Sequence, residues 1–72
     1  MKKNYTLGIA SPIMQALVLV CLQTVFEVQE VVALPTFFLF KVNLKTQDEA
    51  DLLDETIYQL QQNSVVFYVD RY

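Results

Sequence analysis

The sequence contains no histidine, no tryptophan and a single cysteine, Cys21. The lack of histidine excludes the commonest acid–base catalyst and the Ser-His-Asp triad. One cysteine cannot form an intramolecular disulfide, and the usual zinc sites need several Cys or His ligands. Cys21 lies between two apolar residues, with no cationic neighbour that would activate its thiol, so we interpret it as a small buried hydrophobic residue.

Positive charge is also scarce. The chain has five Lys and Arg residues and a net charge of −3, and its one basic cluster is Lys2-Lys3. This charge distribution excludes the basic surface that binds the phosphate backbone of a nucleic acid. The acidic residues of segment 48–55 lack the spacing and the glycine turn of a calcium loop, so we predict a solvated helix face. We interpret Glu27 and Glu30 as ordinary surface charges, and expect neither a cofactor nor an enzymatic activity.

Glycine and proline are rare, with one and two residues, while 54% of the residues are hydrophobic. This composition predicts an ordered chain. Seventy-two residues form a single small α/β domain, residues 1–72, near the lower size limit for burying a core unaided. Such a domain has much surface for its volume, so part of the apolar excess is expected to contact a partner subunit or a membrane.

The clearest local pattern is a helix that begins at Thr46. Thr46-Gln47-Asp48-Glu49 has the form of a capping box, in which the Thr46 hydroxyl accepts the Glu49 N–H and the Glu49 carboxylate reaches the N–H of Thr46. An apolar stripe at helical spacing follows, and Asn63-Ser64 is expected to end the helix, because Asn tolerates the left-handed conformation found there. The residues of the stripe are Ala50, Leu53, Ile57 and Leu60.

The segment from Asn4 to Phe26 carries no charge. One interpretation is a membrane anchor at residues 7–26, since about 20 apolar residues span a bilayer and Lys2-Lys3 would orient it. Gln15, Gln23 and the Ser11-Pro12 break count against a span. A cleaved signal peptide is not expected, because no small-x-small cleavage site follows closely.

The alternative divides this segment in two. Residues 5–10 alternate as a half-buried strand does, and Ser11-Pro12 then starts a helix that we predict from Pro12 to about Gln23. The helical wheel places Leu19 and Leu22 on the side that carries Gln15 and Gln23. We therefore expect Leu19 and Leu22 to be apolar residues on the water-facing side.

The remaining segments are expected to be strands. Residues 25–34 are rich in β-branched residues, which favour a strand, although helical continuation from the preceding segment is also compatible with the pattern. Residues 36–44 place Phe38, Phe40, Val42 and Leu44 on one face. Residues 65–72 form the last strand, in which Val66 and Tyr68 share a face.

The resulting element order is β-α-β-β-α-β. It predicts an α+β fold of the ferredoxin-like type, with two helices on one face of a four-stranded antiparallel sheet. The alternative is one long N-terminal helix that packs on, or anchors, a C-terminal strand–helix–strand unit.

The open face of this sheet is too apolar for free exposure. The residues expected on this face are Val25, Val31, Phe37, Leu39, Val66 and Tyr68. We predict that a second subunit covers this face or the edge strands, as in a homodimer, or that the protein docks onto a larger complex. We expect the protein to be cytoplasmic, and the alternative is that it is associated with a membrane. The candidate interface residues are Leu19, Leu22, Phe37, Leu39, Val66 and Tyr68.

The pattern also resembles the small ACT-type regulatory domains. The resemblance is carried by Tyr5-Thr6-Leu7-Gly8-Ile9-Ala10 leading into a helix, and by Gln59-Leu60-Gln61-Gln62 leading into Val65-Val66-Phe67-Tyr68-Val69. It implies side-by-side dimerisation and amino-acid sensing at the turn after the first strand, here Ala10-Ser11-Pro12.

Overall fold

The computed structural model describes all residues from 1 to 72 and has the predicted β-α-β-β-α-β order. The strands are β1 (Lys2–Gly8), β2 (Glu27–Ala33), β3 (Phe37–Asn43) and β4 (Tyr68–Arg71). The helices are α1 (Pro12–Val25) and α2 (Gln47–Gln62). The α1 helix ends two residues later than predicted, and residues 27–33 form a strand rather than a continuation of that helix.

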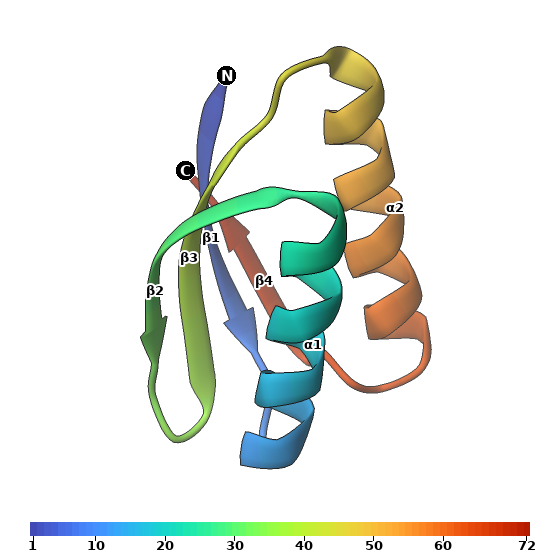
Figure 1. Cartoon of the computed structure of the whole chain (residues 1–72). Coiled ribbons are helices and arrows are strands. Elements are labelled where there is room, and N and C mark those ends of the chain that lie inside the picture. The colour runs from blue at the N-terminus through green and yellow to red at the C-terminus, as the bar shows by residue number, and fades with distance from the viewer.

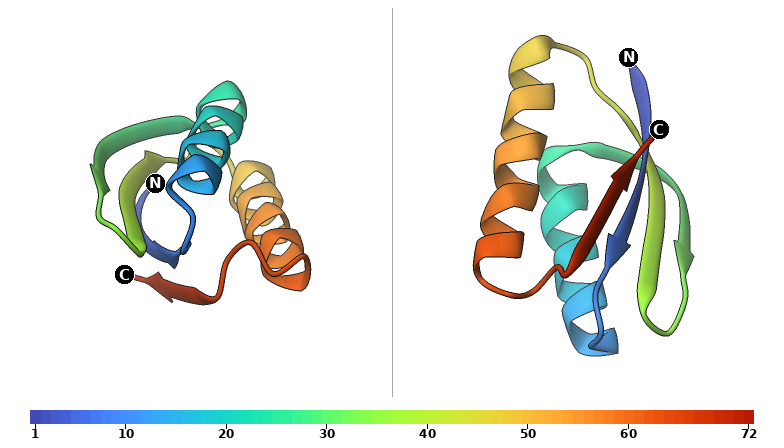
Figure 2. Two further views of the ribbon diagram at one scale, coloured as in Figure 1. Left: turned by 90° about the horizontal axis from the view of Figure 1, so that it is seen from below. Right: turned by 180° about the vertical axis from the view of Figure 1, so that it is seen from behind.

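The four strands form one antiparallel sheet in the order β2-β3-β1-β4, and both helices cover the same face of it (Figures 1 and 2). This is the α+β, ferredoxin-like architecture that the sequence predicts. The first and last strands lie side by side, since Asn4 and Tyr72 exchange both backbone hydrogen bonds. The other face of the sheet carries no helix, as the left view of Figure 2 shows.

The core lies between the sheet and the helices. The residues predicted to share one face of β3 do so and are buried, and β1 contributes Tyr5 and Leu7 from the centre of the sheet. The stripe predicted for α2 is also confirmed, with three residues fully buried and Leu60 packed at the margin. The buried apolar residues are Tyr5, Leu7, Ile9, Val18, Leu22, Phe26, Phe38, Phe40, Val42, Leu44, Ala50, Leu53, Ile57 and Val66.

The buried side of α1 differs from the prediction. Gln15, Val18 and Leu22, at helical spacing, point into the core, whereas Ile13 and Leu17 face outward. Gln15 is only 6% exposed, and its side-chain amide donates to the carbonyl oxygens of Ile9 at 2.8 Å and Leu34 at 3.0 Å. A polar residue is tolerated at this buried position because its side-chain amide is hydrogen-bonded. The helix is therefore rotated about its axis relative to the predicted orientation.

Both helices have the predicted N-terminal caps. The Ser11 hydroxyl accepts from the N–H of Met14 at 3.3 Å, and the Thr46 hydroxyl accepts from the N–H of Glu49 at 3.2 Å. One half of the predicted capping box is wrong, since the Glu49 carboxylate accepts from the N–H of Lys45, at 2.6 Å, instead of the N–H of Thr46.

The C-terminal end of α2 is a Schellman motif. The N–H of Val65 donates to the carbonyl of Leu60, and the N–H of Ser64 donates to the carbonyl of Gln61. The residue in the left-handed conformation is Ser64, with φ of 60°, and not Asn63, whose φ is −89°. Val65 and Leu60 both pack against the core, which is the apolar contact that accompanies this motif.

Ser64→Gly is therefore expected to stabilise the domain by about 1 kcal/mol, because glycine adopts a positive φ without steric cost. The midpoint of urea unfolding, followed by circular dichroism, measures the change. Asn63→Gly is the control: at a negative φ, glycine adds entropy to the unfolded chain, and the bond from Asn63 Nδ2 to the carbonyl oxygen of Gln59 is lost, so that variant is expected to be less stable than wild type. Equal stabilisation by the two variants would contradict this account.

Both edges of the sheet are protected against pairing with another strand. In β2 a bulge between Gln29 and Val32 contains one residue more than the segment of β3 opposite it. Within the bulge, Glu30 has a positive φ of 51°. The other edge, β4, has only four residues. Bulges and short strands are two common ways of preventing edge-to-edge association.

None of the helices is both long and apolar enough to cross a membrane. Residues 7–26, the alternative anchor, are divided between the end of β1, a connection and α1.

Candidate interaction surfaces

The open face of the sheet has an apolar end. Leu39 and Val32 are paired across β3 and β2 on this face, and Phe37 lies two residues from Leu39. On the other side, Phe67 and Tyr68 approach from the start of β4 and are both exposed, Phe67 by 61%. The remainder of the face is polar, with Lys41 and Asn43 further along β3.

Three aromatic rings at this end form one cluster. The Phe37 ring centroid lies 6.1 Å from that of Phe67 and 6.0 Å from that of Tyr68, with the latter pair edge to face. Gly8 lies directly between them in the sheet, since its register partners are Phe37 in β3 and Tyr68 in β4. A Cβ atom on Gly8 would lie 2.8 Å from the Phe67 ring and 2.8 Å from the Cβ of Tyr68. The absent side chain therefore gives the rings room to lie on the sheet.

Two of the six predicted interface residues are not on the surface. Leu22 is 1% exposed, because the side of α1 that carries it faces the core and not the water. Val66 is 2% exposed. Val66 precedes β4, where its N–H donates to the carbonyl of Leu60, so the strand alternation begins only at Tyr68. Leu19 is partly buried against the core, at the margin of the helix layer. The prediction that Leu22 faces water and that Val66 lies on the open sheet face is wrong, whereas Leu19 stays partly exposed.

The other three predicted residues, Phe37, Leu39 and Tyr68, do lie together on the open face. Val25 and Val31, which we also expected there, are at the end of α1 and in the bulge. A strict alternation along each strand puts Val32 and Phe67 on the opposite face, because it ignores both the bulge and the turn before β4.

A second apolar surface, not predicted from the sequence, lies on the helix layer. Ile13, 73% exposed, Leu17 and Val20 point away from the sheet along α1. Cys21, which we expected to be buried, is exposed on the same side. The sequence gives no signal for which side of α1 faces water, because the helix has no charged residue.

The turn after β1, where the ACT resemblance places an effector, is occupied by the start of α1. The Ser11 hydroxyl caps the helix, and the amide of Gln15 is already bonded to backbone carbonyls. A shallow hollow next to this turn is lined mostly by apolar residues and by no charged side chain.

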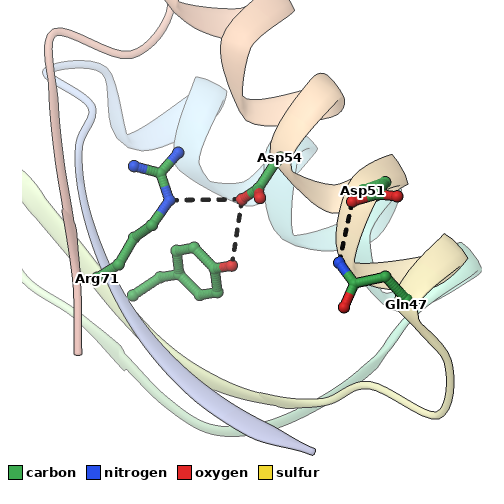
Figure 3. Close-up of polar contacts among 5 residues, drawn as sticks. Gln47, Asp51, Asp54 and Arg71 are labelled. Carbon is green, nitrogen blue, oxygen red and sulfur yellow. Dashed lines mark hydrogen bonds and ion pairs between the residues drawn. The ribbon is translucent and has the colours of Figure 1, made fainter.

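Polar side chains do converge at the other side of the molecule, between β1, β4 and α2. Asp54 of α2 forms an ion pair with Arg71 of β4, with 3.4 Å between Oδ1 and Nε (Figure 3). The hydroxyl of Tyr5 donates to the same carboxylate oxygen at 3.5 Å, and the Arg71 guanidinium lies 5.9 Å from the centre of the Tyr5 ring. Burial raises the pKa of Tyr5 above its ordinary value of 10.0, the Asp54 charge adds to the rise, and Arg71 opposes it.

This arrangement predicts a loss of stability at high pH. In the unfolded chain Tyr5 ionises near its ordinary pKa, whereas the folded protein holds the proton to higher pH. The contribution of Tyr5 is therefore complete below pH 10 and is lost as pH rises through the raised pKa. Urea unfolding between about pH 9 and pH 11 should show a smaller decline for Tyr5→Phe than for wild type. Tyr72→Phe, at an exposed position, is the control, and an unchanged decline in Tyr5→Phe would contradict the prediction.

No group of three or more Cys, Asp and Glu side chains is arranged to hold a metal ion. Comparisons with known protein families, with curated proteins and with solved structures find no match to this chain. The class that the structure defines is a small α+β domain of ferredoxin-like architecture, whose main surface features are two exposed apolar areas.

Proposed function

We propose that this protein is a non-enzymatic interaction module that forms a homodimer through the apolar end of its open sheet face. The observation that carries the proposal is the cluster of Phe37, Phe67 and Tyr68, which lies on the sheet without a covering element. Large exposed aromatic side chains in one patch are typical of protein interfaces and uncommon on free surfaces.

A two-fold axis over the aromatic cluster is the simplest arrangement. The same residues of each copy then meet, as in the isologous interfaces of most small oligomers. Leu39 and Val32 extend the patch from β3 to the edge of β2. A stable interface covers about 800 Å² per partner, which is a little under a fifth of the 4414 Å² surface of this domain. The polar end of the face, with Lys41 and Asn43, then lies at the rim.

Packing by the face is favoured over pairing by the edges. The bulge at Glu30 and the shortness of β4 both oppose a continuous sheet across two subunits. This geometry differs from the side-by-side dimer that the ACT resemblance implies.

The test is Val32→Glu, which places a charge in the apolar patch without removing a core residue. We expect the dimer to dissociate at least tenfold more readily, because the charge would be buried without a partner. Light scattering and sedimentation equilibrium over a range of concentrations measure the dissociation constant.

Gln29→Glu is the matched control, since Gln29 is on the same strand and the same face but lies opposite Lys41, at the polar end. It adds the same charge and is expected to leave the dissociation constant within about threefold of wild type. A wild-type protein that is monomeric at 100 μM would disprove the proposal, as would equal effects of the two substitutions.

A further inference from the structure

The second apolar surface contains a groove between the two helices. It has a volume of about 230 Å³ and is open to solvent along the outer side of the helix layer. Met14, Leu17 and Cys21 line it from α1, and Thr56 and Leu60 line it from α2. The outward side chains of Ile13 and Val20 continue the apolar area along α1.

The α2 helix carries an acidic bank beside this groove, outside the groove's own uncharged lining. On α2, Leu52 is one turn from Thr56 and exposed, and Asp48 and Glu55 lie four and three residues from Leu52, further out on the same side. Neither acid takes part in an ion pair, since the two pairs of the structure are Lys41–Glu30 and Arg71–Asp54.

The helix layer contains no positive charge that could neutralise this bank. All five acids of segment 47–62 belong to α2, while α1 has no charged residue at all. The cations of the chain are in β1, β3, β4 and the connection at Lys45. Glu55 accepts a hydrogen bond from the side-chain amide of Gln59, and Asp48 lies in the first turn of α2, so a cation that pairs with either carboxylate would belong to another molecule.

We propose that the groove between α1 and α2 binds a basic amphipathic helix of a partner protein. The apolar stripe of such a helix fits the Leu17 and Leu60 side, and its Lys or Arg residues reach the acidic bank. The fourteen residues of α1 span about 21 Å, so a partner of about four turns matches the groove in length.

The same charges disfavour the other occupants. A second copy that docked by this face would bring two helix layers together, each with five acids and no cation, and an anionic membrane would be repelled likewise. The groove lies on the layer opposite the aromatic cluster, so its occupancy does not depend on the proposed sheet-face dimer.

The test uses a synthetic 15-residue amphipathic peptide, with leucine at helical spacing on one face and lysine on both flanks, labelled with a fluorophore. Fluorescence anisotropy at 50 mM salt measures its affinity, and we expect saturable one-to-one binding that weakens at least fivefold at 300 mM salt. The otherwise identical peptide with glutamate in place of lysine is expected not to bind. Because Cys21 lines the groove, bound peptide should also slow the alkylation of its thiol by iodoacetamide.

Two substitutions on one helix locate the site. Leu17→Lys places a charge in the groove and is expected to weaken peptide binding at least tenfold, whereas Gln23→Lys adds the same charge on the other side of α1 and should change the affinity no more than threefold. The paired substitution Asp48→Asn with Glu55→Gln should remove most of the salt dependence.

No saturable binding of the lysine peptide would overturn the proposal, and so would equal losses in Leu17→Lys and Gln23→Lys. Binding of the glutamate peptide with similar affinity would show that charge plays no part. If Leu17→Lys dissociates a homodimer that Val32→Glu leaves intact, the occupant is a second copy, and both this proposal and the sheet-face dimer are wrong. Binding to vesicles of anionic lipid that Leu17→Lys strengthens would identify a membrane surface instead.

Discussion

Replacement of Gln15 by glutamate is expected to destabilise the domain by about 3–5 kcal/mol, the usual cost of an uncompensated buried charge. The Gln15 side chain is 6% exposed and donates to the carbonyl oxygens of Ile9 and Leu34, with that of Pro35 at 3.5 Å. One oxygen of a carboxylate at this position would replace Nε2 and face these carbonyl oxygens without a proton to donate. Urea unfolding at pH 7 measures the loss.

The same variant should regain stability in acid. A carboxyl group held among carbonyl oxygens has a folded pKa above its unfolded value of about 4.3, so its native state binds the proton more tightly. The loss is therefore smallest below the unfolded pKa and grows as pH rises through the folded pKa. Gln15→Met, which removes the hydrogen bonds without adding a charge, should cost about 1–3 kcal/mol with no such pH dependence. Gln23→Glu, exposed on the same helix, should lie within about 0.5 kcal/mol of wild type.

The second large effect is expected at Gly8. Gly8→Val should cost about 3 kcal/mol, at the upper end of the range for overpacking, although valine ordinarily favours a strand. A Cβ there would lie 2.8 Å from the Cβ of Tyr68, which cannot move without β4, and within 3 Å of two atoms of the Phe67 ring. Thermal unfolding of the purified variant measures the change.

Thr6→Val is the control for this substitution, because Thr6 is two residues away on the same face of the same strand. At Thr6 no clash opposes the strand propensity of valine. The free energy of unfolding is therefore expected to rise by between zero and about 0.5 kcal/mol. If Gly8→Val were as stable as wild type, the rings of Phe67 and Tyr68 would not lie against the strand as described.

The order of the elements could be predicted because each is defined locally, by the caps at Ser11 and Thr46 and by the β-branched run of residues 25–34. The orientation of α1 about its own axis could not be predicted from the sequence. A helix without charged residues has no clear outer side, and Gln15 was assigned to water although its amide donates to the carbonyl oxygens of Ile9, Leu34 and Pro35. A hydrogen bond between residues 15 and 34 leaves no trace in a local pattern.

The candidate interface was half predictable for a similar reason. Phe37 and Leu39 follow the regular alternation of β3, and their place on the open face is confirmed. Val66 does not, because the Schellman motif at Ser64 delays the start of β4, and Val32 changes face after the bulge at Glu30. Each error comes from one residue with a positive φ, neither of them glycine, which is where sequence patterns give the least warning.

The strand order β2-β3-β1-β4 has a consequence for the chain during its synthesis. The strand made first, β1, has both of its partners far downstream, at residues 37–43 and 68–71. At 5–20 residues per second the ribosome takes about 1.5–6 s to go from Gly8 to Phe37, and during this time β1 and the uncharged α1 have no sheet to cover them. We expect chaperones that bind apolar segments to recognise such a nascent chain, and a slower ribosome would prolong its exposure.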